Sequence, residues 1–243
     1  MLKAVLENLS PPNQPLKPGP PTRVFVGEGF DRPTLLFGGE VIPVVMASAG
    51  VRRILALAYL LVWAWHEHRV AAKLLRKSPE SRLTVLIDEP ETHLHPSWQR
   101  RIVPALLDAV ANLPDGHTPL TQMLIATHAP MVLASLEPVF DEEADGLFHL
   151  RLRDGVVCLA RHAWAKQGDA TNWLGSEVFG LVQARSLHAE RAVKAAEAFM
   201  RGEKAELGNK QQIDAELRRV LAGHDPFWPR WVVFAEKNHG KGR

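Results

Sequence analysis

The chain has 243 residues, of which 46% are hydrophobic and 23% charged, with a formal net charge of +2. This composition is typical of a globular α/β protein with one core and an appendage, and the near-neutral charge neither favours nor excludes nucleic-acid binding. Cys158 is the only cysteine, which excludes an internal disulfide and favours a reducing, cytoplasmic location. The most apolar stretch, Ile54–Trp65, is too short to cross a membrane.

The first 42 residues predict little regular structure. Residues 1–21 are rich in proline and polar residues, which indicates a loose leader or a segment that has lost its partner lobe. Two short strands are expected after it, at Thr22–Val26 and Thr34–Phe37. We therefore treat residues 1–42 as a truncated N-terminal segment.

A long helix is predicted from Val51 to about Arg69, where apolar residues recur at helical spacing. Ser48, Ala49 and Gly50 precede it, and Ser48 is a suitable N-cap. Small residues at a helix start let a phosphate approach the exposed amides and the positive end of the helix dipole. Simple helix capping is the competing interpretation.

The segment Leu83–Ile87 is short, apolar and without alternation, which predicts a strand buried on both faces of a parallel sheet. Asp88 and Glu89 follow it, so both should lie at the carboxyl edge of the sheet, where α/β proteins bind ligands. Asp88 is suited to hold Mg²⁺, and Glu89 to orient or deprotonate a water. An ordinary acidic turn is the alternative.

A second strand is expected within Gln122–Ala129, and a helix over Ser97–Ala111 links it to the first strand. Strand, helix and strand form a βαβ unit, which places both strand ends on one edge. His128 should therefore approach the same site as Glu89, where a neutral imidazole could hydrogen-bond a phosphate or the attacking water.

The C-terminal part predicts a hairpin and helices. Asp154-Gly155 is a strong turn signal between strands at Leu147–Arg153 and Val156–Arg161, and this hairpin is expected to cap the edge of the sheet. Residues 183–243 are expected to form a helical hairpin, Ala189–Met200 and Lys210–Leu221, followed by an aromatic tail. A docked tail would bury its aromatic residues, and an undocked one would present a partner site.

In chain order, the Ser-Ala-Gly helix start, IDEPE, ETHLHP and ATHAP resemble the signature motif, Walker B, D-loop and switch histidine of ABC-type ATPase heads. The likeness is to the AAA-type, SMC-like ATPases of bacteria, including the overcoming-lysogenization-defect-like families, and covers about Pro43–Leu181. It implies an α/β, P-loop NTPase-like C-terminal lobe over residues 43–182, with a parallel sheet and a C-terminal helical appendage.

The resemblance also implies roles for the motif residues. Ser48 and Gly50 match the signature, with Ala49 between them; Asp88 matches the metal-side acid, Glu89 the catalytic glutamate and His128 the switch histidine. The implied cofactors are ATP and Mg²⁺. The implied partners are a second copy or a Walker A-bearing lobe, an effector nuclease and DNA, in phage defence, DNA repair or chromosome handling.

The phosphate-binding motif G-x-x-x-x-G-K-S/T does not occur in the 243 residues. Two functions therefore stay open: one lobe of an ATPase completed by a Walker A lobe, or a non-hydrolytic scaffold that dimerises or binds a partner. The histidine pairs His66/His68 and His93/His95 suggest a metal, but with one cysteine they define no tetrahedral zinc set.

Overall fold

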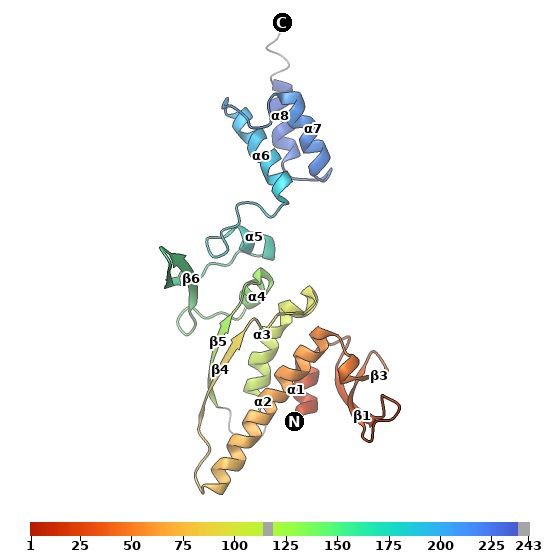
Figure 1. The fold of residues 1–243 in the computed structure, drawn as a ribbon. Helices are drawn as coiled ribbons and strands as arrows, with labels where there is room; N and C mark the ends of the chain where they lie inside the picture. The colour runs from red at the N-terminus through yellow and green to blue at the C-terminus, as the bar shows by residue number, and fades with distance from the viewer. Residues whose placement is uncertain (114–118, 238–243) are drawn as a thin grey trace. The chain divides into compact units, whose positions relative to one another are not determined.

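A computed structural model of the chain describes residues 1–113 and 119–237. It divides into two compact units, Met1–Gly180 and Leu181–Arg243 (Figure 1). None of the described helices is long and apolar enough to cross a membrane. The first unit holds the α/β elements, and the second holds helices α6 to α8.

The N-terminal segment is more ordered than the sequence predicts. Helix α1 (Leu2–Leu9) buries Leu6 and Leu9 in the core of the first unit, so this stretch is not a loose leader. An antiparallel sheet follows, in the order β1 (Lys17–Thr22), β2 (Arg32–Phe37) and β3 (Glu40–Pro43). The strand expected near Thr34–Phe37 is confirmed as part of β2, whereas the one expected at Thr22–Val26 is wrong, because β1 ends at Thr22.

Helix α2 (Ala49–Leu74) follows a short 3-10 turn, Val44–Met46, and is longer than predicted at both ends. Its inner face packs with α3 (Pro96–Ala111) and with α1 in the main core. Strands β4 (Arg82–Asp88) and β5 (Leu120–Ala126) pair in parallel, and α3 connects them. The predicted βαβ unit and the α/β class are therefore confirmed.

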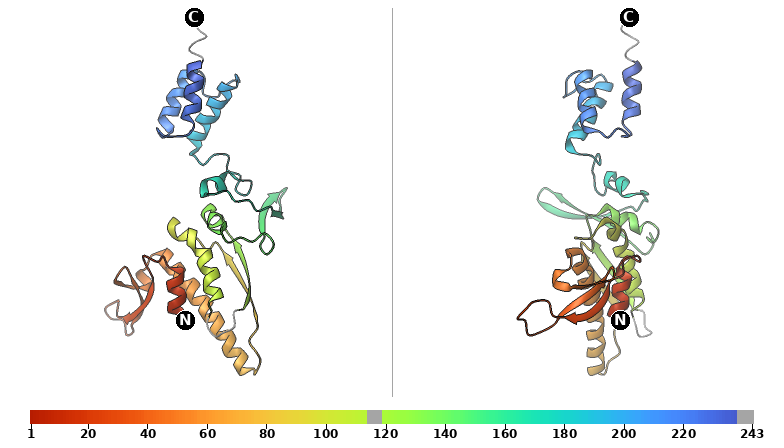
Figure 2. Two further views of the ribbon diagram at one scale, coloured as in Figure 1. Left: turned by 180° about the vertical axis from the view of Figure 1, so that it is seen from behind. Right: turned by 90° about the vertical axis from the view of Figure 1, so that its right-hand side faces the viewer.

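One face of the β4–β5 pair is exposed, which corrects the prediction of a strand buried on both sides. Along both strands, exposed residues alternate with half-buried ones. Ile87 and Ile125 pack on the helical core, whereas Leu86 is 75% exposed and Leu124 is 47% exposed. In the part of the chain that the structure describes, helices cover one side of this two-stranded sheet (Figure 2).

After β5, the chain forms α4 (Pro130–Leu136), then the hairpin of β6 (Leu147–Arg153) and β7 (Val156–His162), then α5 (Ala170–Gly175). Asp154 and Gly155 form the turn with positive φ values of 50° and 77°. The hairpin prediction is confirmed, but its expected place is wrong, because β6 and β7 form a separate sheet and do not pair with β4 or β5.

The second unit is a three-helix cluster of α6 (Leu187–Met200), α7 (Lys210–Val220) and α8 (Trp228–Lys237). Both predicted helices are present, and the aromatic tail supplies the third. Trp231 is 1% exposed and Phe227 is 4% exposed, packed against α6 and α7. The tail is therefore docked within its own unit.

Candidate functional site at the ends of two parallel strands

The ends of β4 and β5 bring the two predicted catalytic side chains together. Asp88 is in register with Ala126, and the amide of Glu89 donates to the Ala126 carbonyl at 2.8 Å, extending the ladder one residue past the strand. Nε2 of His128 then lies 2.5 Å from Oε1 of Glu89. The parallel register alone brings these two residues to one edge of the sheet.

Glu89 sits in a constrained turn. Its φ is +46°, in the left-handed region that residues with a Cβ rarely adopt. Oε2 accepts a hydrogen bond from the Thr92 hydroxyl at 2.9 Å, while Oε1 faces His128. Hydrogen bonds from Thr92 and then from His128 hold the pKa of Glu89 below its ordinary value, so this carboxylate is ionised at neutral pH.

Asp88 is exposed at the last position of β4, and its carboxylate makes no hydrogen bond or ion pair with the described residues. A side chain of α2 forms hydrogen bonds with the backbone at this point. Nη2 of Arg53 donates to the carbonyls of Asp88 and Glu89, at 2.9 and 3.1 Å. Nothing in the sequence pattern distinguishes Arg53 from neighbouring Arg52, so this contact was not predicted.

The start of α2 shows the features of helix capping. Ser48 is the N-cap, and its hydroxyl accepts from the Val51 amide at 3.3 Å. Ser48 and Ala49 are exposed. Gly50 packs against the turn after β4, where a Cβ would lie 2.8 Å from the His93 carbonyl oxygen. The small residue at position 50 therefore has a packing reason, and a phosphate contact at this helix start stays a prediction.

Glu91 is a residue of this region that the sequence analysis missed. It is 7% exposed, and its Oε1 accepts from the Thr127 hydroxyl at 2.6 Å. This bond joins the turn after β4 to the turn after β5. The partners lie 36 residues apart in the chain, so no local pattern predicts their contact.

One histidine of each pair has a structural partner. Nδ1 of His95 accepts from the Ser97 amide at 3.2 Å and caps α3, and Nε2 of His68 accepts from the Glu80 amide at 3.0 Å. Among the described residues, no group of three or more His, Cys, Asp or Glu side chains is placed to hold a metal ion.

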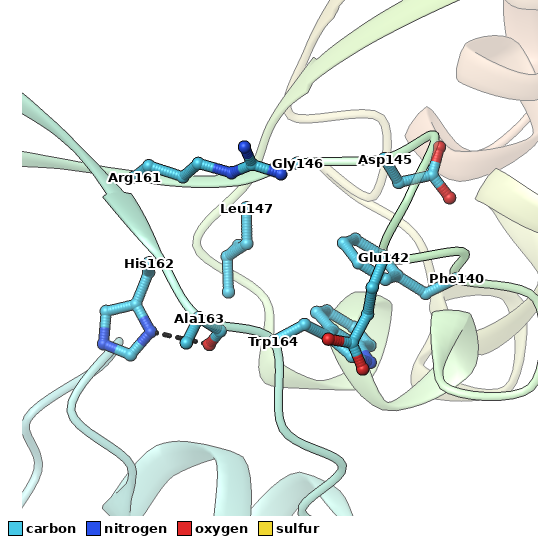
Figure 3. A pocket seen from close by; sticks show the side chains of 9 residues that line it. All are labelled: Phe140, Glu142, Asp145, Gly146, Leu147, Arg161, His162, Ala163 and Trp164. Atoms are coloured by element: carbon cyan, nitrogen blue, oxygen red, sulfur yellow. Dashed lines mark hydrogen bonds between the residues drawn. The ribbon is translucent and has the colours of Figure 1, made fainter.

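A small cavity of about 100 Å³ lies elsewhere in the first unit, between the end of the α4 segment and the hairpin (Figure 3). The rings of Phe140 and Trp164 stack beside it with centroids 3.8 Å apart. Asp88, Glu89 and His128 do not line this cavity. We therefore place the candidate site at the strand ends, which are open to solvent.

Comparison with known proteins finds a family match over part of the first unit. Residues 34–134 match the family described as "AAA domain, putative AbiEii toxin, Type IV TA system". The matched range includes the start of α2, the turn after β4 and His128. The match covers less than half of the chain and shows a similarity to this AAA family over that part.

Two curated relatives are named as retron ATPases. The Retron Ec83 probable ATPase of Escherichia coli is 40% identical over 53 residues, 22% of this chain and 8% of that protein. The Retron Vc95 probable ATPase of Vibrio cholerae serotype O1 biovar El Tor is 30% identical over 109 residues, 42% of this chain and 18% of that protein. The likeness thus spans less than a fifth of either relative.

Solved structures of SMC ATPases are also similar. One, from work on ATP-driven dimerization and DNA-stimulated activation of SMC ATPases, aligns with 67% of this chain and 81% of its own at 16% identity and a TM-score of 0.41. A SmcHead bound to the C-winged helix domain of ScpA aligns with 67% of this chain and 41% of its own at 15% identity and a TM-score of 0.40.

Proposed function

We propose that residues 43–182 form the C-terminal lobe of an ABC-type, SMC-like AAA ATPase, which hydrolyses ATP once a Walker A-bearing lobe completes the site. The contact between Glu89 and His128 at the ends of parallel strands carries this proposal. The pair joins a carboxylate that can orient water to an imidazole that can hydrogen-bond a phosphate or the same water.

The residues of the strand-end site fit a nucleotide with its metal ion. The exposed Asp88 carboxylate is an oxygen ligand of the kind that Mg²⁺ prefers, and it makes no competing bond with the described residues. In this proposal, Ser48, Ala49 and Gly50 present the amides of a helix start to the phosphates across a dimer interface. When bound, Mg²⁺ would neutralise phosphate charge.

Glu89 acts mainly by orienting the attacking water. Its lowered pKa makes it a weak proton acceptor, since an efficient general base has a pKa near the working pH. Thr92 fixes one carboxylate oxygen and His128 the other, so the orientation of the group is set before water binds. The biological role that we propose is phage defence or DNA repair, beside an effector nuclease; the retron names of the two relatives support a defence setting.

A non-hydrolytic scaffold is the second candidate. The observation that favours it is the absence of a G-x-x-x-x-G-K-S/T motif from the 243 residues. In that case the same surface binds a partner without turnover, and substitution of Glu89 changes no rate.

Substitution of Glu89 tests the proposal. In the assembly with a Walker A-bearing lobe, Glu89→Gln should keep ATP binding and lower kcat by a factor on the order of a hundred, because the amide keeps the shape of the side chain but not the charge that orients the water. Glu67→Gln, at an exposed position of α2, is the matched control. Wild-type turnover in Glu89→Gln would refute the catalytic assignment and favour the scaffold.

A further inference from the structure

Glu91 has a connection to the site that its position in the sequence does not reveal. It lies in the turn after β4, is 7% exposed, and accepts the Thr127 hydroxyl hydrogen at 2.6 Å. The Thr127 oxygen in turn accepts from the amide of Ala129 at 3.0 Å. Ala129 is the residue before α4 and has no side-chain cap of its own. The residues on both sides of His128 are thus held by one chain of hydrogen bonds.

The His128 ring depends on this backbone because little else fixes it. Its side chain is 83% exposed, and its described polar contact is the one with Glu89. A side chain that exposed gains no orientation from packing, so the position of its Cα and the single contact decide where the ring lies. A shift of the Thr127–Ala129 turn would therefore carry the imidazole away from Glu89.

The placement of Glu91 costs stability. Its Oε2 is buried without a hydrogen-bond partner among the described residues. A buried polar atom left unpaired is unfavourable, and replacing both partners of a buried polar pair by apolar groups of similar shape is often neutral or stabilising. Packing alone does not account for a carboxylate here.

We propose that Glu91 is a positioning residue, which acts through Thr127 to hold His128 within reach of Glu89. Its catalytic consequence rests on the proposed ATPase function. The positional part does not, because the hydrogen-bond chain lies within this lobe. The two parts can therefore be tested separately.

Two pairs of variants separate the hydrogen bond from the bulk of the side chains. Glu91→Met removes the acceptor and keeps the length, while Glu91→Gln keeps a carbonyl oxygen that can accept from Thr127. Thr127→Val removes the hydroxyl, while Thr127→Ser keeps it. Glu67→Met, on the exposed face of α2, controls for the general effect of replacing a glutamate by methionine.

The measurement is the NMR order parameter of the His128 ring carbons in the chain by itself, with the signals assigned by their loss in His128→Gln. We expect the order parameter to fall below about 0.6, the range of flexible groups, in Glu91→Met and Thr127→Val. It should keep its wild-type value in Glu91→Gln and Thr127→Ser. If Glu91→Met does not fold, the Thr127 pair carries the test. A wild-type order parameter in folded Glu91→Met or Thr127→Val would overturn the proposal.

Turnover by the complete assembly tests the catalytic consequence. Displacing the ring should lower kcat of Glu91→Met by a factor on the order of a hundred and leave the KM for ATP unchanged, because positioning acts on the chemical step. A mobile ring with wild-type kcat would overturn the catalytic consequence and the role of His128 in the proposed function. A rigid ring would overturn the assignment of Glu91 while leaving the ATPase proposal intact.

Discussion

Gly50 has a packing role at the helix start that its place in the sequence does not reveal. In the sequence, its small size suggests room for a phosphate; in the structure, its α-carbon faces the His93 carbonyl. His93 has a φ of +66°, so its peptide is already in an unusual conformation and has little freedom to move away. The close approach ties the start of α2 to the turn that follows Glu89.

Gly50→Ala should therefore destabilise the first unit. The added Cβ would lie 2.8 Å from a backbone oxygen, and such overpacking costs about 1–3 kcal/mol. The higher helix propensity of alanine offsets at most about 1 kcal/mol of this. Chemical denaturation measures the change in the free energy of unfolding. Gly29→Ala is the matched control, because nothing lies within 4 Å of its added Cβ. Equal stability of the two variants would contradict the packing account.

At the scale of elements, the sequence predicted well what local spacing determines. The apolar run before Asp88, the helical spacing of α3 and the Asp154-Gly155 turn each lie within a few residues, and each element formed where expected. The approach of His128 to Glu89 was also predictable, since parallel strands end on one edge.

Other long-range contacts were not predictable, because no rule of strand topology brings the partners together. Arg53 reaches the carbonyl of Asp88 from 35 residues away, and Thr127 reaches Glu91 from 36. The exposure of Leu86 also escaped prediction, because an apolar run indicates burial without saying which neighbour provides it. Residues 1–9 looked loose from composition, yet Leu6 completes a core formed by distant segments.

An ion pair within the second unit gives a pH-dependent prediction. Nη2 and Nε of Arg185 donate to the two oxygens of Asp225 at 2.7 and 3.1 Å. The side chains are 24% and 13% exposed. The hydrogen bond from Arg185 lowers the pKa of Asp225 below its ordinary value. The stabilisation is therefore complete above the unfolded pKa of about 3.9 and is lost as the pH falls through the lower, folded pKa.

Asp225→Asn should remove this stabilisation. Wild type should be more stable than Asp225→Asn at neutral pH, and the difference should shrink below about pH 4. Denaturation curves followed by the indole NMR signal of Trp231, buried in the same unit, measure it. Glu206→Gln is the control, because the Arg191–Glu206 pair is 58% and 68% exposed and such pairs contribute little. A difference that stays constant down to pH 2 would contradict the linkage.

At the scale of the whole molecule, the main question is whether Ser48 and Glu89 of one chain contribute to the same proposed site or to two different ones. Within one chain, Arg53 links the first turns of α2 to the carbonyl of Glu89, so the helix start and the turn after β4 are near each other. The proposed function nevertheless assigns Ser48 to the phosphate bound by the opposite subunit. The alternative is that Ser48 contacts the phosphate bound by its own chain.

Ser48→Arg should abolish hydrolysis by the complete assembly without unfolding the lobe. A bulky side chain blocks the approach of a phosphate to the helix amides, whereas loss of the cap costs only about 1 kcal/mol of stability. Ser186→Arg is the matched control. Ser186 caps α6 in the same way, its hydroxyl accepting from the Ala189 amide at 3.2 Å, and this control should lose a similar amount of stability while keeping turnover.

Mixed dimers distinguish the two arrangements. If Ser48 acts across the interface, a subunit with both Ser48→Arg and Glu89→Gln, paired with wild type, disables both sites, since each defect falls in a different one. Splitting the substitutions between subunits places both defects in one site, so that dimer should keep about half the activity. If Ser48 acts within its own chain, the order of the two turnover rates is reversed, because the doubly substituted subunit then inactivates only its own site. Turnover of the two mixed dimers, each purified with distinct tags, therefore decides between the arrangements, and equal rates would contradict a phosphate role for Ser48 and leave it as a helix cap.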